Sequence, residues 1–197
     1  MAAELGIFPQ YIARKPETIV LQDKIMSLSG GSADITLLGA GPSGGAPLFR
    51  VDGKTMSLKG RRSVTDAATN APLFDIVKEH MHLHATYAAV DPSGTKLLEV
   101  KSHFSLIGSK ADVSFTDRSG RARTLLMKGD WASRSADIED EKGVAVARIS
   151  RKFGGNVGRE LMGGQTYAVE IMPGVDMALV VAMCICLDAK KDADRGS

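Results

Sequence analysis

Basic side chains are the residues of this chain best suited to binding chemistry. The densest group contains Lys54, Lys59, Arg61 and Arg62. Lysine and arginine gathered at one place can hold phosphate through charge-assisted hydrogen bonds. The same charges also protect an exposed strand edge, which is their commoner role. We take the four residues as a hypothetical patch for anionic headgroups, with edge protection as the alternative. A second cluster allows the same two interpretations and consists of Arg148, Arg151, Lys152 and Arg159.

Three histidines alternate along one stretch of the chain, at His80, His82 and His84. In a strand their side chains would project from one face, and imidazoles are common ligands of zinc and copper. We favour a solvated polar face instead, because neighbours on one strand seldom converge on an ion without a ligand from elsewhere. Nothing in the sequence places the fourth histidine, His103, beside the triplet. We therefore predict no metal and keep the triplet as a weak candidate site.

Gly39, Gly41 and Gly44 follow a strand-like run with the spacing of a dinucleotide fingerprint. That motif binds a pyrophosphate only where a helix begins at the loop. Here Gly45 weakens a helix start, and Pro47 leaves no room for a helix to continue. The pattern predicts a glycine-rich loop between two strands, and we expect no cofactor.

No group of serine, histidine and aspartate has the context of a catalytic elbow or triad. The two cysteines, Cys184 and Cys186, lie inside an apolar run, where they serve as small core residues. Their side chains would point about 200° apart on a helix, so they cannot form a disulfide. Free core cysteines are typical of a reducing compartment. We expect a protein that is not an enzyme.

The apolar run from Met177 to Leu187 is the strongest structural signal. It is apolar on every side, so a helix formed by it must be buried all round. It is also shorter than the roughly 20 residues that cross a bilayer. We predict a buried hydrophobic helix over Asp176–Asp188, with Asp176 as its N-cap.

The chain before this helix consists of short runs with period-2 alternation, separated by turn residues. One strong hairpin signal is Asp52-Gly53, which predicts a two-residue turn between strands at 49–51 and 56–58. About a dozen short strands indicate a sandwich or a barrel. Only a closed barrel can enclose a whole helix, and closure removes strand edges. We predict a mainly β fold, a closed antiparallel barrel of roughly twelve strands around the helix.

Composition places no strong demand on the partner. The 197 residues include 25 basic and 23 acidic side chains, for a net charge of +2. Nothing therefore draws the whole molecule to nucleic acid, and any electrostatic site must be local. We expect an N-terminal arm over residues 1–16, one barrel domain over 17–188 and a polar tail over 189–197. No signal peptide is visible, so an intracellular location, cytoplasmic or peripheral to a membrane, is the expectation. A closed barrel also makes a monomer the default.

The chain contains a set of short motifs, Phe49–Lys54, Pro72–Phe74, Gly129–Trp131, Ser135–Ile138, Gly143–Ala147, Ile149–Lys152, Gln165–Tyr167 and Pro173–Asp176. Together these motifs resemble the LURP-one-related family. The last motif, which leads into the apolar run, is the most specific. The resemblance implies a tubby C-terminal-like and phospholipid-scramblase-like fold, a twelve-stranded barrel around a C-terminal helix. It carries over no catalytic residue.

Tubby-like domains bind phosphoinositides, so the resemblance implies anionic lipid as a partner. We therefore expect a non-enzymatic binding or regulatory module that meets anionic phospholipid headgroups through a basic patch. A protein-interaction scaffold that acts through its loops is the alternative. A nucleotide- or metal-binding enzyme ranks below both, because only the glycine motif and the histidine triplet support it.

Overall fold

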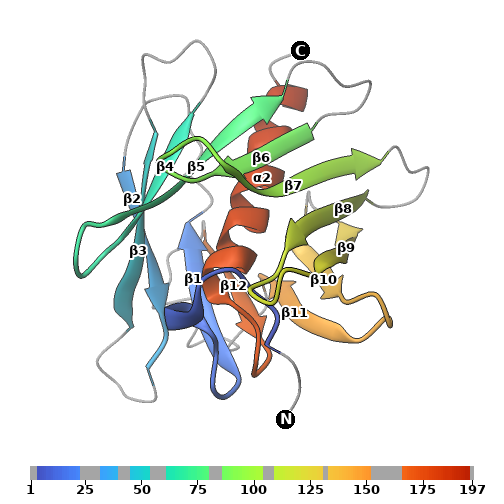
Figure 1. The fold of residues 1–197 in the computed structure, drawn as a ribbon, viewed down its shortest axis with the longest axis horizontal. Coiled ribbons are helices and arrows are strands. Elements are labelled where there is room, and N and C mark those ends of the chain that lie inside the picture. Colours follow the sequence, from blue (N-terminus) through green and yellow to red (C-terminus); the bar gives the residue numbers. More distant parts are fainter. Residues whose placement is uncertain are drawn as a thin grey trace.

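The computed structural model describes residues 4–22, 32–39, 45–53, 61–79, 86–103, 109–130, 133–151 and 166–195. They form twelve strands, a short 3-10 helix and a long C-terminal helix (Figure 1). The elements are η1 (Pro9–Tyr11), β1 (Glu17–Gln22), β2 (Ser32–Leu37), β3 (Ala46–Gly53), β4 (Arg62–Asp66), β5 (Pro72–Glu79), β6 (Thr86–Val90), β7 (Lys96–His103), β8 (Ser109–Thr116), β9 (Ala122–Asp130), β10 (Ser135–Glu139), β11 (Ala145–Ser150), β12 (Thr166–Ile171) and α2 (Met177–Arg195).

The strands form one closed antiparallel barrel. Each strand pairs with the next along the chain, and β1 closes the circle by pairing with β12 from Glu17 opposite Ile171 to Gln22 opposite Thr166. The prediction of a closed, twelve-stranded barrel is confirmed. Because every strand has a neighbour on both sides, the described sheet has no exposed edge.

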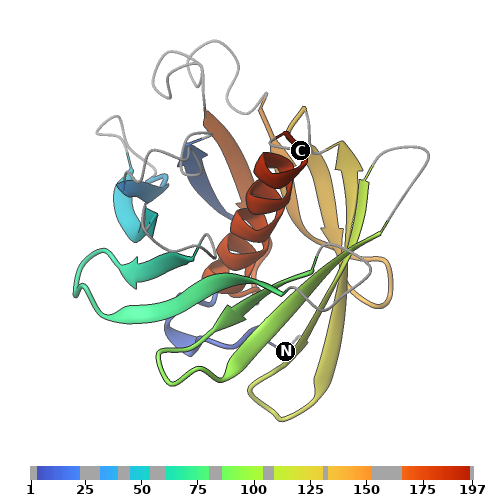
Figure 2. The ribbon, with the colours of Figure 1, turned by 90° about the horizontal axis from the view of Figure 1, so that it is seen from above.

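Helix α2 fills the barrel (Figure 2). Every residue from Met177 to Ala189 is buried, and Leu179, Met183 and Ile185 are among the largest side chains that are fully enclosed. Inward-facing strand residues such as Phe49 and Leu125 supply the matching apolar wall. Each large apolar side chain contributes about 1.5–3 kcal/mol when it leaves water. The predicted buried helix is therefore confirmed as the centre of the core.

The helix continues beyond the predicted end at Asp188 and ends at Arg195. The reason is local, because Ala189, Lys190 and Lys191 are strong helix formers. The first glycine after them is Gly196. Part of the segment expected to be a polar tail is therefore helical.

The predicted two-residue hairpin at Asp52-Gly53 is wrong. Both residues belong to β3, where Asp52 lies opposite Ser63 and Gly53 lies opposite Arg62 on β4. β3 therefore includes the turn signal and ends at Gly53, and β4 begins at Arg62. The strand predicted at 56–58 lies outside the described residues. Here the pairing of β3 with its neighbours on both sides outweighs the local turn preference of the Asp52-Gly53 dipeptide.

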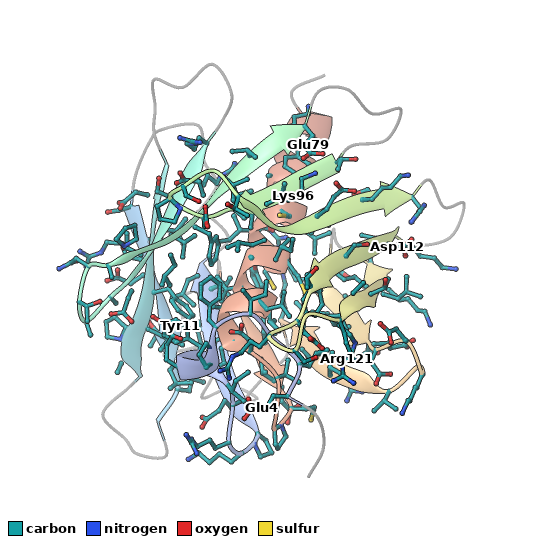
Figure 3. All side chains as sticks on the ribbon, viewed as in Figure 1. Glu4, Tyr11, Glu79, Lys96, Asp112 and Arg121 are labelled. Atoms are coloured by element: carbon teal, nitrogen blue, oxygen red, sulfur yellow. The ribbon has the colours of Figure 1, made fainter. Side chains whose placement is uncertain are left out.

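The up-and-down order of the strands gives the barrel two ends. The arm end holds residues 4–16, the start of α2 and the turns that follow β4, β6, β8 and β10. The far end holds the last residues of the odd-numbered strands β3 to β11 and the region around Asp188. Figure 3 shows Glu4, Tyr11 and Arg121 near the arm end, and Glu79 near the far end.

At the arm end, residues 5–13 form hydrogen bonds with the chain just before α2. The Leu5 N–H donates to the Gly174 carbonyl at 2.8 Å, and the Gly174 N–H donates to the Ala13 carbonyl at 2.7 Å. The Asp176 carboxylate connects the arm to the start of α2. One oxygen caps the helix by accepting from the Ala178 N–H at 2.9 Å, and the other accepts from the Ile7 N–H at 2.9 Å. The predicted N-cap is confirmed.

The Asp176 side chain is fully buried. Its second oxygen also accepts from the Phe8 N–H at 2.7 Å. Burial raises the pKa of Asp176, and the backbone N–H groups that surround the carboxylate oppose that rise. Gly6 passes so close that an added Cβ would lie 2.3 Å from the Asp176 Cβ, so this position has no room for a side chain.

The turns at the arm end share one device, an aspartate that accepts hydrogen bonds from the residues after it. Asp117 accepts from the Ser119 hydroxyl at 2.5 Å and from the Arg121 N–H at 3.1 Å. Asp91 and Asp140 bind their own turns in the same way. These contacts lower the pKa of Asp117 to about 2, with the Ser119 hydroxyl as the largest cause.

Replacing Asp176 should destabilise the whole barrel. Asp176→Ala removes the cap and leaves buried N–H groups without an acceptor, so we expect a loss of about 3 kcal/mol or more in the free energy of unfolding. Asp176→Asn keeps one carbonyl acceptor and should lose less. Urea denaturation measures both, and an alanine variant as stable as the parent would contradict this role.

Asp117 should contribute stability only where it is ionised. Its pKa is about 2 in the folded chain and about 3.9 in an unfolded one, so its contribution is fully present above the unfolded value and disappears as the pH falls through the folded value. The stability difference between the parent and Asp117→Asn should therefore be constant above about pH 5 and shrink towards about pH 2. Denaturation curves across this range test it, and a gap that widens on acidification would contradict it.

Candidate functional site

The far end contains the described part of the predicted basic patch. Arg61 precedes β4 and Arg62 begins it, opposite Ile76 on β5. The Arg61 Nε lies 3.5 Å from the Asp75 Oδ2, which offsets part of its charge. Lys54 and Lys59 lie outside the described residues, so the structure places only two of the four predicted residues.

Strand β4 does not lie at an open edge of the described sheet, because it pairs with β3 on one side and with β5 on the other. Arg62 therefore has no open strand edge to protect. The binding role of the four-residue patch stays a prediction.

Sequence reasoning missed three further lysines at the far end. Lys78 lies one residue before the end of β5, Lys101 two before the end of β7, and Lys110 one after the start of β8. All three side chains are exposed, and within the described part of the chain none has an acidic partner. They are far apart in sequence and reach the same end of the barrel only through strand pairing.

Most cations elsewhere on the wall are paired with acids. Arg50 lies 2.9 Å from Asp34, and Arg148 lies 2.8 Å from Asp137. Lys96 lies 2.6 Å from Glu79 (Figure 3). Lys78, Lys101 and Lys110 have no such acidic partner within the described residues.

A buried charged cluster lies inside the far end. The Arg134 guanidinium donates to Asp188, and the Tyr167 hydroxyl donates to the other Asp188 oxygen at 3.1 Å. The guanidinium carbon also lies 4.9 Å from the centre of the Tyr167 ring. Arg134 adopts a left-handed backbone conformation with φ of 56° and is 5% exposed. The cluster fastens the connection between β9 and β10 to the central helix.

Beside this cluster lies a cavity of about 10 Å³, the space of about one water molecule. Arg134, Tyr167, Ile149, Cys184 and Leu187 line it. Burial, together with the nearby Asp188, raises the pKa of Tyr167 well above its usual value. Burial likewise raises the pKa of the Cys184 thiol. Both groups therefore remain protonated, and the cavity offers no ionised nucleophile.

The other predicted sites gain little from the structure. His80, His82 and His84 lie outside the described residues, as do Lys152 and Arg159. Within the described ranges no three His, Cys, Asp or Glu side chains gather as a metal site. Arg148 is engaged by Asp137, and Arg151 is exposed after β11.

The glycine motif lies between two antiparallel strands. Gly39 follows β2, and β3 begins at Ala46 and pairs with β2. Residues 40–44 lie outside the described part, but the direct return to a neighbouring strand is not a strand–helix–strand unit. The prediction of a connection between two strands is confirmed. Cys184 and Cys186 are free and buried, as predicted for core residues.

A family model described as LURP-one-related matches residues 17–188. The chain belongs to the LURP-one-related family. It is 23% identical over 190 residues to Protein LURP-one-related 10 of Arabidopsis thaliana, covering 92% of this chain and 94% of that one. A solved X-ray structure of a protein from Arabidopsis thaliana is similar at 18% identity with a TM-score of 0.43, covering 96% of this chain and 99% of the other.

No helix in the described ranges is both long enough and apolar enough to span a membrane. For α2 this follows from its composition, because the apolar run ends at Asp188 and a charged segment completes the helix.

Breaking the buried cluster from one side should cost more than removing it whole. Asp188→Leu leaves the Arg134 guanidinium buried without its acceptor, and such losses are about 3–5 kcal/mol. The double variant Arg134→Met with Asp188→Leu removes both charges and should recover a large part of that loss. Urea denaturation of the single and double variants tests this, and additive losses would contradict the coupling.

Proposed function

We propose that this protein is a non-enzymatic binding module that docks on anionic phospholipid headgroups, phosphoinositides included, through the basic far end of its barrel. The observation that carries the proposal is the exposed set of Lys78, Lys101 and Lys110, which have no acidic partner within the described residues. Arg61 and Arg62 lie at the same end. A lysine near an anionic membrane contributes about 1 kcal/mol of binding, so several together give a useful affinity.

The described part of the barrel also favours binding over catalysis. The interior is filled by α2, and the buried polar cluster at the far end has its charges satisfied internally. Chemistry would need a reactive group with access to a substrate. The exposed basic surface needs only contact with an opposite charge.

A lipid surface suits this end because its cations come from separate strands. The three lysines belong to three different strands: Lys78 to β5, Lys101 to β7 and Lys110 to β8. The partner therefore need not be one small anion that contacts all three. A membrane presents many phosphates at once and can meet each lysine separately. A protein partner that docks on the loops is the competing outcome of the test below.

Neutralising these lysines should weaken binding to anionic vesicles. Lys78→Gln with Lys101→Gln removes two charges, and we expect a loss of about 2 kcal/mol, roughly thirtyfold in affinity. Co-sedimentation of the full chain with phosphoinositide-containing vesicles, repeated across a salt series, measures this. Binding should also weaken as salt rises.

The matched control neutralises two exposed lysines at the arm end, Lys15→Gln with Lys142→Gln. It changes the net charge equally and should leave affinity within about twofold of the parent. Equal losses for the two double variants would contradict a role of the far end. Absence of vesicle binding at low salt would contradict the lipid proposal and favour a protein partner.

A further inference from the structure

The outer wall of β7, β8 and β9 carries three basic side chains in register, which we call the basic row. His103 lies directly opposite Lys110, and Lys110 lies directly opposite Lys128. Neighbouring strands are about 4.8 Å apart, so the three side chains leave the wall next to one another. Like charges directly opposite each other destabilise a sheet. Lys110 and Lys128 are such a pair, which is unfavourable for folding and points to a use of Lys110 outside the fold.

Acidic side chains engage the two outer members of the row. The His103 Nε2 lies 2.7 Å from the Asp112 Oδ2, and the Lys128 Nζ lies 2.5 Å from the Glu139 Oε2. Lys110, in the centre, is exposed and has no acidic partner in the part of the chain that the structure describes. The positive charge at the middle of the row is thus left for a partner.

Lys101 extends this surface along β7. It lies two residues before His103, so both side chains leave the same face of the strand. Lys101 is directly opposite Asp112, the acid that engages His103. Figure 3 labels Asp112, which marks this part of the wall. The basic row and Lys101 therefore form one surface across three adjacent strands.

This surface lies on the outside of a barrel, where no walls enclose a ligand. Lysine side chains are long and flexible, and the Lys128 side chain is 42% exposed even with Glu139 beside it. The cavity inside the far end is too small for a headgroup, and its Arg134 already donates to Asp188. Mobile cations on an outer wall respond to the amount of nearby negative charge rather than to the shape of one molecule.

We infer that Lys110, which lies between His103 and Lys128 in the basic row, binds the phosphate-bearing surface of a membrane together with Lys101, and that the two respond to its charge density rather than to the structure of one headgroup. The inference rests on the proposed function and deepens it. It assigns the contact to the wall of β7–β9, and it defines the partner as a dense anionic lipid surface.

The test compares two kinds of phosphatidylcholine vesicle that are made equally negative, one with phosphatidylserine and one with a phosphatidylinositol bisphosphate. The full chain should co-sediment with both at affinities within about threefold of each other. Lys110→Glu should weaken binding to both by roughly tenfold or more, because it replaces an attraction by a repulsion. Lys142→Glu, the same change on an exposed lysine at the arm end, should weaken it by about twofold at most.

A folding defect should not account for weaker binding by this variant, because Lys110→Glu places an acid between His103 and Lys128 and should stabilise the sheet. Its thermal midpoint should equal or exceed that of the parent. Tenfold tighter binding to the bisphosphate vesicles would overturn the inference while the proposed function stands. Equal effects of Lys110→Glu and Lys142→Glu would do the same if Lys78→Gln with Lys101→Gln still weakens binding. Failure to bind either vesicle at low salt would overturn the proposed function and this inference together.

Discussion

The buried carboxylate of Asp176 holds together the parts on which the rest of the structure depends. One oxygen starts the central helix and the other holds the arm, through N–H groups of Ala178, Ile7 and Phe8. The helix in turn fills the barrel, and the barrel places every far-end residue. A single polar group can have this effect because a buried carboxylate must find donors, and these N–H groups of the arm and the helix supply them.

The two ends of the barrel differ in the contacts that their charged side chains make. In the turns of the arm end, aspartates accept hydrogen bonds from residues of their own turn, as Asp117 does from Ser119 and Arg121. Their charges are used within the fold. The far end is fastened from inside by Arg134 and Asp188, while Lys101 and Lys110 remain exposed on its wall. Buried contacts thus stabilise the far end, and under the proposed function its exposed lysines contact the membrane.

The sequence was sufficient for the fold because its main signal is global. An apolar run without a polar side between Met177 and Leu187 can only be buried, and short alternating runs are what a barrel needs to bury it. The Asp52-Gly53 turn could not be judged in the same way. A dipeptide carries a local preference, and strand pairing over the whole length of β3 decided against it.

The candidate site was less accessible to sequence reasoning. Arg61 and Arg62 were visible because they are adjacent, whereas His103, Lys110 and Lys128 come together only through register. A shift of one residue in either pairing would turn Lys110 to the other face. Likewise, the helix cap at Asp176 followed from local spacing, but its bond to Ile7 joins residues 169 positions apart and has no sequence signal.

Hydrogen–deuterium exchange with and without anionic vesicles tests the central claim most directly, since it reports which end of the barrel meets the membrane. Peptides that contain the far-end residues of β4, β5, β7 and β8 should become more protected. Peptides that contain the turns at Asp91, Asp117 and Asp140 should not change. Protection confined to the arm end, or no protection at either end when the protein sediments with the vesicles, would contradict the account.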